Sequence, residues 1–242
     1  MIKFLNVILF CGMVVMNYLA NALPLNNKTT GQLSDAYPNL FVPAGITFSI
    51  WGVIYLLLAI FCMLQFTPSN QTSVNKIGWA FALSCVFNAL WIVCWHFEKV
   101  PLSLVVMTGL LLSLIYVNAQ LASESPGIFK AAFGIYLGWI CIATIANVTA
   151  LLVFYKWNGF GIPEQAWTII MILAGACIAI LAMYKYRNPF IGLSVIWAFT
   201  GIIIKRHHDY SMIVLAAAFA LVVVAVLSVR GFLKIYGFDL RY

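Results

Sequence analysis

The sequence predicts an all-α, polytopic membrane protein with about eight transmembrane helices. Of its 242 residues, 64% are hydrophobic and only 8% are charged, whereas charged residues make up roughly 25% of a soluble globular domain. Eight charge-free runs each hold an apolar segment close to the roughly 20 residues that cross a bilayer, although the run 188–204 is marginal. The runs are residues 4–27, 36–75, 77–97, 100–123, 131–155, 165–184, 188–204 and 210–229. Open sheets cannot face lipid and no run alternates as a barrel strand does, so the spans are helices.

The first run predicts a transmembrane helix that is retained in the protein. A cleaved signal peptide is the alternative, because Lys3 precedes the apolar stretch and Ala20-Asn21-Ala22 resembles a cleavage site. The stretch is long enough to span, which favours the retained helix. Residues 23–42 then form the longest polar connection, and loops of that length without obvious structure are usually binding loops, lids or disordered segments.

Four more helices are expected before residue 157. They cover residues 43–66, 77–97, 101–121 and 128–154, with turns at residues 67–73 and 123–127 and with Pro101 opening the fourth helix. Gly134 and Gly138 form a G-x-x-x-G motif in the fifth helix, which indicates close contact with another helix.

The segment 157–164 is the best candidate for an internal boundary. After it we expect three helices, at residues 165–184, 189–204 and 210–227, joined by very short connections. The sequence thus divides into a five-helix bundle, residues 1–157, and a three-helix extension, residues 163–242. We expect the extension to pack beside the bundle without lining the pocket described below.

The distribution of basic residues predicts the topology. The formal net charge is +7, but Lys and Arg stand singly at span ends, where they anchor helices, so no nucleic-acid partner is expected and the lipid bilayer is the main environment. With the N-terminus inside, eight Lys and Arg residues lie on that face and five on the other. This excess favours cytoplasmic termini, and we expect an integral protein of a bacterial inner membrane.

Residues for catalysis or metal binding are scarce. The six acidic residues lie at span ends or in loops, and the six cysteines lie inside apolar runs without metal-ligand spacing. We therefore predict no catalytic residue, no metal site and no required cofactor. His96 is interpreted as an interfacial histidine, with an axial haem ligand as the alternative. Four tryptophans near span ends are interpreted as a headgroup-level belt: Trp79, Trp95, Trp157 and Trp167.

A set of aromatic and amide side chains predicts a pocket between three helices. Phe48, Trp51 and Tyr55 share one helical face. Asn88 lies three residues before Trp91 in the next expected helix. In the fifth helix the pattern is Tyr136, Trp139, Ala143 and Asn147. Packing and interhelical hydrogen bonds are one use for such residues, and a flat, largely apolar ligand is the other.

These three segments resemble motifs of the tryptophan-rich sensory protein and translocator protein family (TspO/MBR). The family's P-x-x-x-x-F-x-x-V-W-x-x-L-Y is matched by Pro43, Phe48, Ile50, Trp51, Ile54 and Tyr55. Its N-x-x-W is matched by Asn88 and Trp91, and its Y-L-x-W-x-x-x-A-T-x-x-N by Tyr136, Leu137, Trp139, Ala143, Thr144 and Asn147. The resemblance covers residues 1–157. It departs from the family at residues 38–42, where the usual tryptophan is missing, and in the three additional helices.

The resemblance implies a pocket that opens under the first loop and binds tetrapyrroles, with porphyrin or haem as the ligand, or in some members sterols. The expected ligand-binding residues are Pro43, Phe48, Trp51, Tyr55, Asn88, Trp91, Tyr136, Trp139, Ala143 and Asn147. The expected role is a carrier, scavenger or sensor rather than an enzyme. Light-dependent porphyrin breakdown is one alternative. A structural subunit that binds itself as a homodimer, or another membrane partner, through the C-terminal helices is the other.

Overall fold

The computed structural model describes residues 2–22, 26 and 28–235 and is helical throughout, apart from turns and connections. Its α-helices are α1 (Ile2–Ala22), α2 (Thr30–Asp35), α3 (Ile50–Leu64), α4 (Gln71–Ile77), α5 (Ala80–His96), α6 (Val100–Gln120), α7 (Ile128–Phe154), α8 (Glu164–Tyr186), α9 (Phe190–Arg206) and α10 (Ser211–Ile235). Short 3-10 helices occupy Gly45–Ser49 (η2), Pro68–Asn70 (η3) and Gly159–Gly161 (η4). The all-α polytopic class predicted from composition is confirmed.

The number of membrane spans differs from the expected eight. Within the described residues, six helices are long and apolar enough to cross a bilayer: α1, η2 with α3, α6, α7, α8 and α10. A seventh span is formed if α4 and α5, which are bent by 60° at their junction, are counted together. The remaining long helix, α9, has 17 residues, which is the lower end of the length that spans a bilayer, about 17–25 residues.

Three helix boundaries differ from the expected ones, each for a local reason. The first loop contains α2, whose start is fixed by a capping box between Thr29 and Gln32. Residues 71–77, expected to lie partly in a turn, form α4, and Gly78 separates it from α5 by adopting a φ of 54°, which glycine tolerates without a Cβ clash. The second expected helix begins as the 3-10 turn η2 before it becomes α3.

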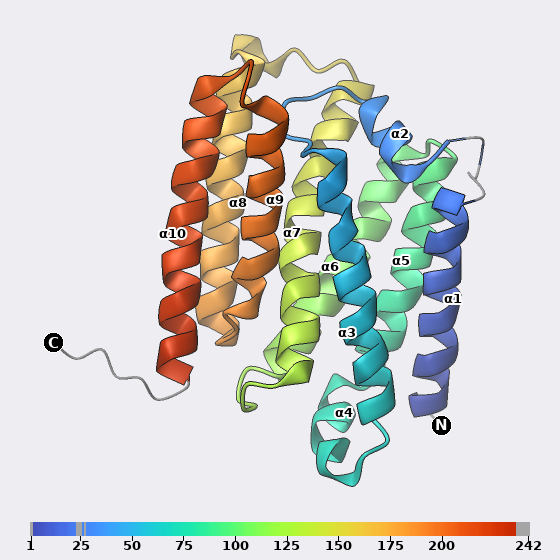
Figure 1. Ribbon diagram of the computed structural model, residues 1–242. Coiled ribbons are helices and arrows are strands. Elements are labelled where there is room, and N and C mark those ends of the chain that lie inside the picture. The colour runs from blue at the N-terminus through green and yellow to red at the C-terminus, as the bar shows by residue number, and fades with distance from the viewer. Residues whose placement is uncertain (1, 23–25, 27, 236–242) are drawn as a thin grey trace, which may run out of the picture.

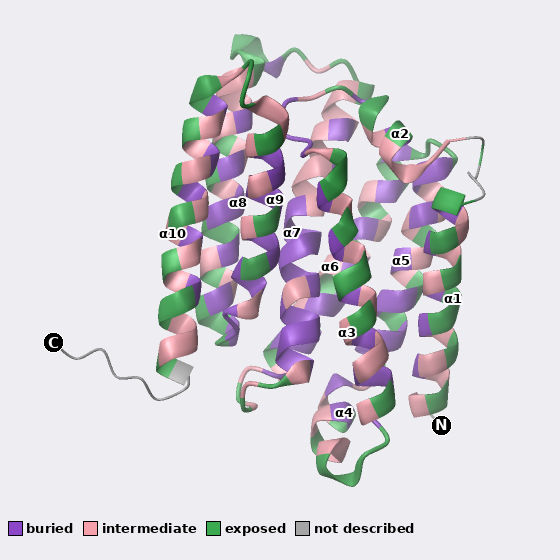
Figure 2. Ribbon diagram, in the orientation of Figure 1, coloured by how far each residue is buried: buried purple, intermediate pink, exposed green. Residues whose placement is uncertain are grey.

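Helix α7 lies at the centre of the bundle and is its most extensively buried element (Figures 1 and 2). It packs against α3 and α6 from the first half of the chain and against α9 from the second. The G-x-x-x-G motif makes the last contact possible, because a Cβ on Gly138 would overlap the carbonyl oxygen of Ile191, and one on Gly134 would overlap the Asn188 side chain. The close contact predicted for this motif is thus made within the chain, and one continuous apolar core includes residues of α3, α7 and α10.

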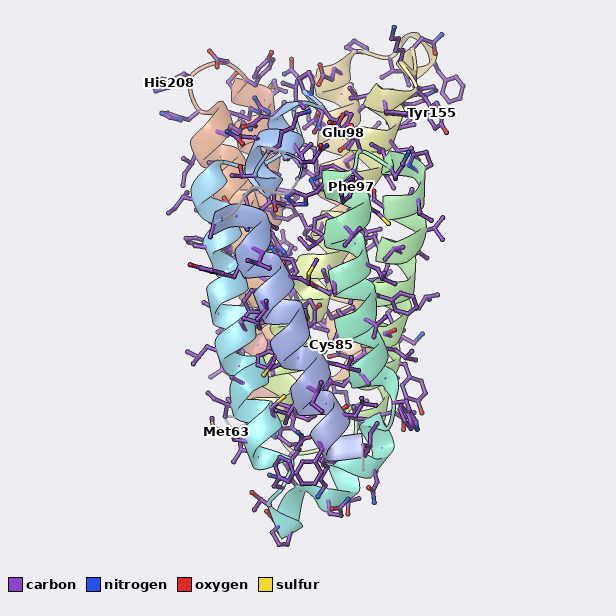
Figure 3. All side chains as sticks on the ribbon, turned by 90° about the vertical axis from the view of Figure 1, so that its right-hand side faces the viewer. Met63, Cys85, Phe97, Glu98, Tyr155 and His208 are labelled. Atoms are coloured by element: carbon purple, nitrogen blue, oxygen red, sulfur yellow. The ribbon has the colours of Figure 1, made fainter. Side chains whose placement is uncertain are left out.

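The two ends of the bundle carry different residues. Glu98, Tyr155 and His208 lie at the end that also holds α2, and Met63 lies toward the opposite end (Figure 3). The start of α1 and the end of α10 share that opposite end (Figure 1). Seven described Lys and Arg residues lie there, at positions 3, 76, 130, 185, 187, 230 and 234, against five at the α2 end. Arg241, the eighth in the sequence count, lies outside the described residues.

Candidate functional site

A narrow cavity, here called the inner pocket, lies between α3, α5 and α7 beneath the loop that contains α2. Seven of the ten predicted ligand-binding residues line it: Pro43, Phe48, Trp51, Trp91, Trp139, Ala143 and Asn147. The loop contributes Thr30, Ser34, Asn39 and Val42. The cavity volume is about 60 Å³, which is far below the roughly 300–1,000 Å³ typical of small-molecule sites. The structure therefore brings the predicted residues together around a nearly closed slot.

The aromatic rings of α3 and α7 meet edge to face along one side of the inner pocket. The Trp139 ring is 6.0 Å from Phe48 and 6.2 Å from Trp51, with interplanar angles of 85° and 83°. Both arrangements are favourable for aromatic pairs. Tyr55 stacks on Trp51 from one helical turn below, at 5.5 Å and 24°. The stacking fixes the indole of Trp51 from behind, so that it faces the pocket.

Hydrogen bonds hold the opposite side of the inner pocket. The indole N–H of Trp91 donates to Oδ1 of Asn147 at 3.1 Å, which joins α5 to α7. The amide nitrogen of Asn147 donates in turn to Oγ of Ser103 on α6 at 3.0 Å. Asn147 is therefore saturated within the protein, and its amide positions Trp91 instead of being available to a ligand.

The other three predicted residues lie outside the lining of the inner pocket. The amide of Asn17 donates to Asn88 Oδ1 at 2.7 Å, and the amide of Asn88 donates to the Tyr136 hydroxyl at 2.8 Å. This buried chain joins α1, α5 and α7. Tyr55 supports Trp51, as described above. Asn88, Tyr136 and Tyr55 thus support the pocket from one layer deeper.

Trp95 and His96 were expected at the membrane interface and are instead buried under α2, so these two interpretations are wrong. Trp95 stacks on Trp91 at 5.7 Å and 17°, and Tyr37 of the loop covers it. Nδ1 of His96 lies 2.9 Å from the Ile92 carbonyl oxygen. Burial raises the pKa of the Tyr37 phenol and Glu98 raises it further, so this cover is uncharged at neutral pH.

Two indole N–H groups in the lining of the inner pocket have no acceptor. They belong to Trp95 and Trp139, whose Nε1 atoms are buried without a hydrogen-bond partner among the described residues. An unpartnered buried donor costs roughly 1–3 kcal/mol, and such groups in native proteins call for an explanation. Both are donors only. The pocket therefore presents two free donors to any acceptor that enters it.

Residues 39–42, here called the roof segment, are held by side chains from α8 and α9. Arg206 donates Nε to the Leu40 carbonyl at 3.1 Å and Nη2 to the Asn39 carbonyl at 2.8 Å. The Leu40 N–H donates to Oε1 of Glu164 at 2.9 Å. Asn39 Oδ1 accepts the N–H groups of Phe41 and Val42, both at 3.1 Å. The segment is thus a backbone turn whose external ties all come from the C-terminal helices.

The same two helices hold the start of η2. The Ala44 N–H donates to the Gly201 carbonyl at 3.0 Å, and the Trp197 indole donates to the Thr47 carbonyl at 2.8 Å. Gly201 is needed because a Cβ there would overlap Oγ1 of Thr47. The lining of the inner pocket itself comes from residues 30–150. The C-terminal helices position the pocket's cover from outside.

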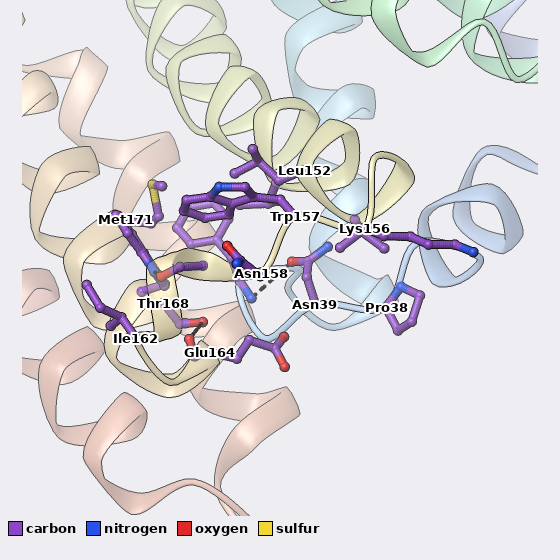
Figure 4. Close-up of a pocket in the computed structure, with 15 residues that line it drawn as sticks. Pro38, Asn39, Leu152, Lys156, Trp157, Asn158, Ile162, Glu164, Thr168 and Met171 are labelled. Atoms are coloured by element: carbon purple, nitrogen blue, oxygen red, sulfur yellow. Dashed lines mark hydrogen bonds between the residues drawn. The ribbon is translucent and has the colours of Figure 1, made fainter.

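A larger outer cavity of about 430 Å³ lies on the other side of the roof segment. Figure 4 shows its walls: Asn39 comes from the loop before α3, Trp157 from the α7–α8 connection, and Thr168 and Met171 from α8. Trp157 and Trp167 pack together here at 5.1 Å. Asn39 lines both cavities. The roof segment therefore separates the inner pocket from a space large enough for a small molecule.

Some lining residues had no place in the sequence prediction although part of the signal was there. Ala146 and Ala150 continue the helical face of Trp139 and Ala143, and both line the pocket. Trp95 lies one turn after Trp91 on the same face. The roof residues carry no comparable signal, since their position depends on Arg206, 166 residues away. In the described part of the chain no three His, Cys, Asp or Glu side chains gather as a metal site.

Comparison with known proteins adds one finding. The sequence model of the family described as TSPO-like protein matches residues 3–230. The match includes α8 and α9 and most of α10, beyond the region that carries the motifs. No curated protein and no solved structure matches this chain.

Proposed function

Because this chain belongs to the TSPO-like protein family, we propose that it binds a flat, largely apolar tetrapyrrole such as porphyrin or haem in the inner pocket. Its role would be that of a carrier, scavenger or sensor within the membrane. The integral membrane location follows from its apolar helices and its family. Placing the start of α1 on the cytoplasmic side is a further part of the proposal, supported by the excess of basic residues at that end.

The observation that carries the proposal is the indole N–H of Trp139, which faces the pocket without an acceptor. Around it are the ring faces and edges of Phe48, Trp51 and Trp91. Stacking surfaces with a few convergent donors suit a planar macrocycle with acceptor groups at its edge or centre. A pure packing role would leave the buried donor as an uncompensated cost.

The size of the inner pocket requires that it opens before a macrocycle enters. A volume of about 60 Å³ holds only one or two water molecules by the usual measure. The roof segment is the natural moving part because it separates this slot from the outer cavity of about 430 Å³. Moving it disrupts hydrogen bonds and little of the apolar core. We propose that ligand enters as the roof segment shifts and the two spaces join.

The test replaces Trp139 by Phe, which removes the indole N–H and keeps a ring. Protein stability should stay the same or rise slightly, because the lost donor has no partner in the free protein. Affinity for protoporphyrin, followed by the absorbance of the porphyrin, should fall about three- to tenfold, the worth of one hydrogen bond. Trp79→Phe is the matched control, since Trp79 is 57% exposed and lies outside the pocket lining.

Three outcomes would contradict the proposal. Stoichiometric binding could be absent from the unmodified protein, or Trp139→Phe and Trp79→Phe could bind with equal affinity. Trp139→Phe could also unfold at a markedly lower temperature, which would make Trp139 a packing residue. New absorbing products formed under light, and lost in Trp139→Phe, would instead assign an enzymatic role.

A further inference from the structure

A second site lies at the end of the bundle that holds the start of α1, between the last turns of α8 and α10. It is a cavity of about 670 Å³, lined by Met183, Tyr184, Arg187, Pro189, Leu227, Arg230, Gly231 and Lys234. Helices α8 and α10 run side by side to this point (Figure 1). It lies at the opposite end from the roof segment and shares no lining residue with either pocket described above. We call it the basic cradle.

The charged groups of the basic cradle are all cationic. Arg187, Arg230 and Lys234 line it, and no carboxylate is found among its described lining residues. None of the three takes part in a salt bridge within the described chain, where Lys28, Lys76 and Lys205 do. Three cations around one cavity repel each other unless an anion lies between them. The arrangement therefore favours an anionic ligand.

The backbone keeps these cations close together. Arg187 ends α8 in the left-handed conformation, with φ 49° and ψ 45°, which turns the chain into α9. Gly231 lets α10 approach this turn, because a Cβ there would lie 2.9 Å from Cβ of Pro189. The cradle is thus formed by a tight helix–turn–helix contact that α10 closes.

Apolar surface continues from the cradle toward the middle of the bundle. Leu181 lies three residues before Tyr184 on α8 and is 69% exposed, and Val226 lies four residues before Arg230 on α10 and is 48% exposed. At these spacings each lies on the same helical face as its partner at the cradle. A ligand with an anionic head and an apolar body would match both parts. A free inorganic anion would match only the cradle.

We propose that the basic cradle binds the headgroup of an anionic phospholipid, with the acyl chains along the exposed faces of α8 and α10. Cytoplasmic leaflets are rich in such lipids, and each Lys or Arg near the surface adds about 1 kcal/mol of attraction. The phosphate would lie among Arg187, Arg230 and Lys234. The site is independent of tetrapyrrole binding at the other end of the bundle.

The experiment compares two double variants of the full chain in detergent. Arg230→Gln with Lys234→Gln removes two cradle cations. Lys3→Gln with Lys185→Gln removes two cations at the same end of the bundle but outside the cradle. Binding of phosphatidylglycerol and of phosphatidylcholine is counted by native mass spectrometry over a lipid titration. Thermal unfolding is measured with phosphatidylglycerol and, separately, with inorganic phosphate.

The unmodified protein should retain phosphatidylglycerol in preference to phosphatidylcholine. The cradle variant should bind phosphatidylglycerol about thirtyfold more weakly, which corresponds to about 2 kcal/mol at 1.4 kcal/mol per tenfold. The control variant should stay within about threefold of the unmodified protein. Equal losses in the two variants, or equal retention of the two lipids, would overturn the proposal. Inorganic phosphate that stabilises the protein as well as the lipid does would show a simple anion site instead.

Discussion

Replacing Arg206 by Gln should open the roof segment more often and accelerate ligand entry. The Arg206 guanidinium donates to the carbonyls of Asn39 and Leu40, at 2.8 and 3.1 Å, and the shorter, neutral Gln cannot make both contacts. Hydrogen bonds to a charged group contribute roughly 1.5–3 kcal/mol. Arg206 is partly exposed, so we take about 1 kcal/mol for each. The closed roof segment then loses about 2 kcal/mol relative to the open one.

A loss of about 2 kcal/mol raises the open population about thirtyfold, since 1.4 kcal/mol is one decade. If porphyrin enters only through the open form, its association rate constant should rise by up to that factor, because the observed rate follows the fraction of competent protein. Dissociation should accelerate as well, because the roof segment closes less firmly over the ligand. Stopped-flow absorbance with protoporphyrin measures both rate constants.

Lys205→Gln is the matched control, because it removes the same charge from the neighbouring residue. Lys205 contacts Asp35 at 3.3 Å, but the Asp35 side chain is 73% exposed, and such surface pairs contribute little. Its rate constants should change less than twofold. Unchanged association in a folded Arg206→Gln protein would refute entry through the roof segment. Equal acceleration in both variants would show an effect of net charge.

Three other substitutions separate the roles of the surrounding residues. Ala143→Leu places three extra carbons into the slot of about 60 Å³ and should abolish porphyrin binding in the titration while lowering stability by only about 1–3 kcal/mol. Asn88→Leu leaves the Tyr136 hydroxyl without its partner and should lower the unfolding free energy by about 2–4 kcal/mol in chemical denaturation, with ligand affinity changed less than threefold. Gly201→Ala pushes against Thr47 and should accelerate porphyrin association as Arg206→Gln does. A result opposite to any of these would reassign the residue concerned.

The sequence predicted the central helix correctly because its information is local. Residues 128–154 were expected to be helical, and α7 runs from Ile128 to Phe154. Trp139 and Ala143 line the inner pocket as their spacing predicts. Asn147 also lines it, but its amide is used by Trp91 and Ser103, and only the tertiary structure shows this.

The misplaced residues were those whose environment depends on distant parts of the chain. Trp95 and His96 are at the end of a long apolar helix, where interfacial side chains are the usual case. They are buried because α2 folds back over them, which places Tyr37 against Trp95. The start of α2 could have been predicted from Thr29 and Gln32, which form a capping box. Its position over α5 could not, because that is set by tertiary packing.

The C-terminal helices acquire a function from this geometry although they do not line the inner pocket. The roof segment has few apolar contacts of its own, and its backbone is held by Glu164 of α8 and Arg206 of α9. Short polar ties of this kind open at lower cost than a packed core, because they exchange readily for hydrogen bonds with water. The apolar contacts of α9 with α7, by contrast, are extensive and fix the position of Arg206. A rigid helix therefore holds a loosely held cover, which allows the pocket to open without unfolding the bundle.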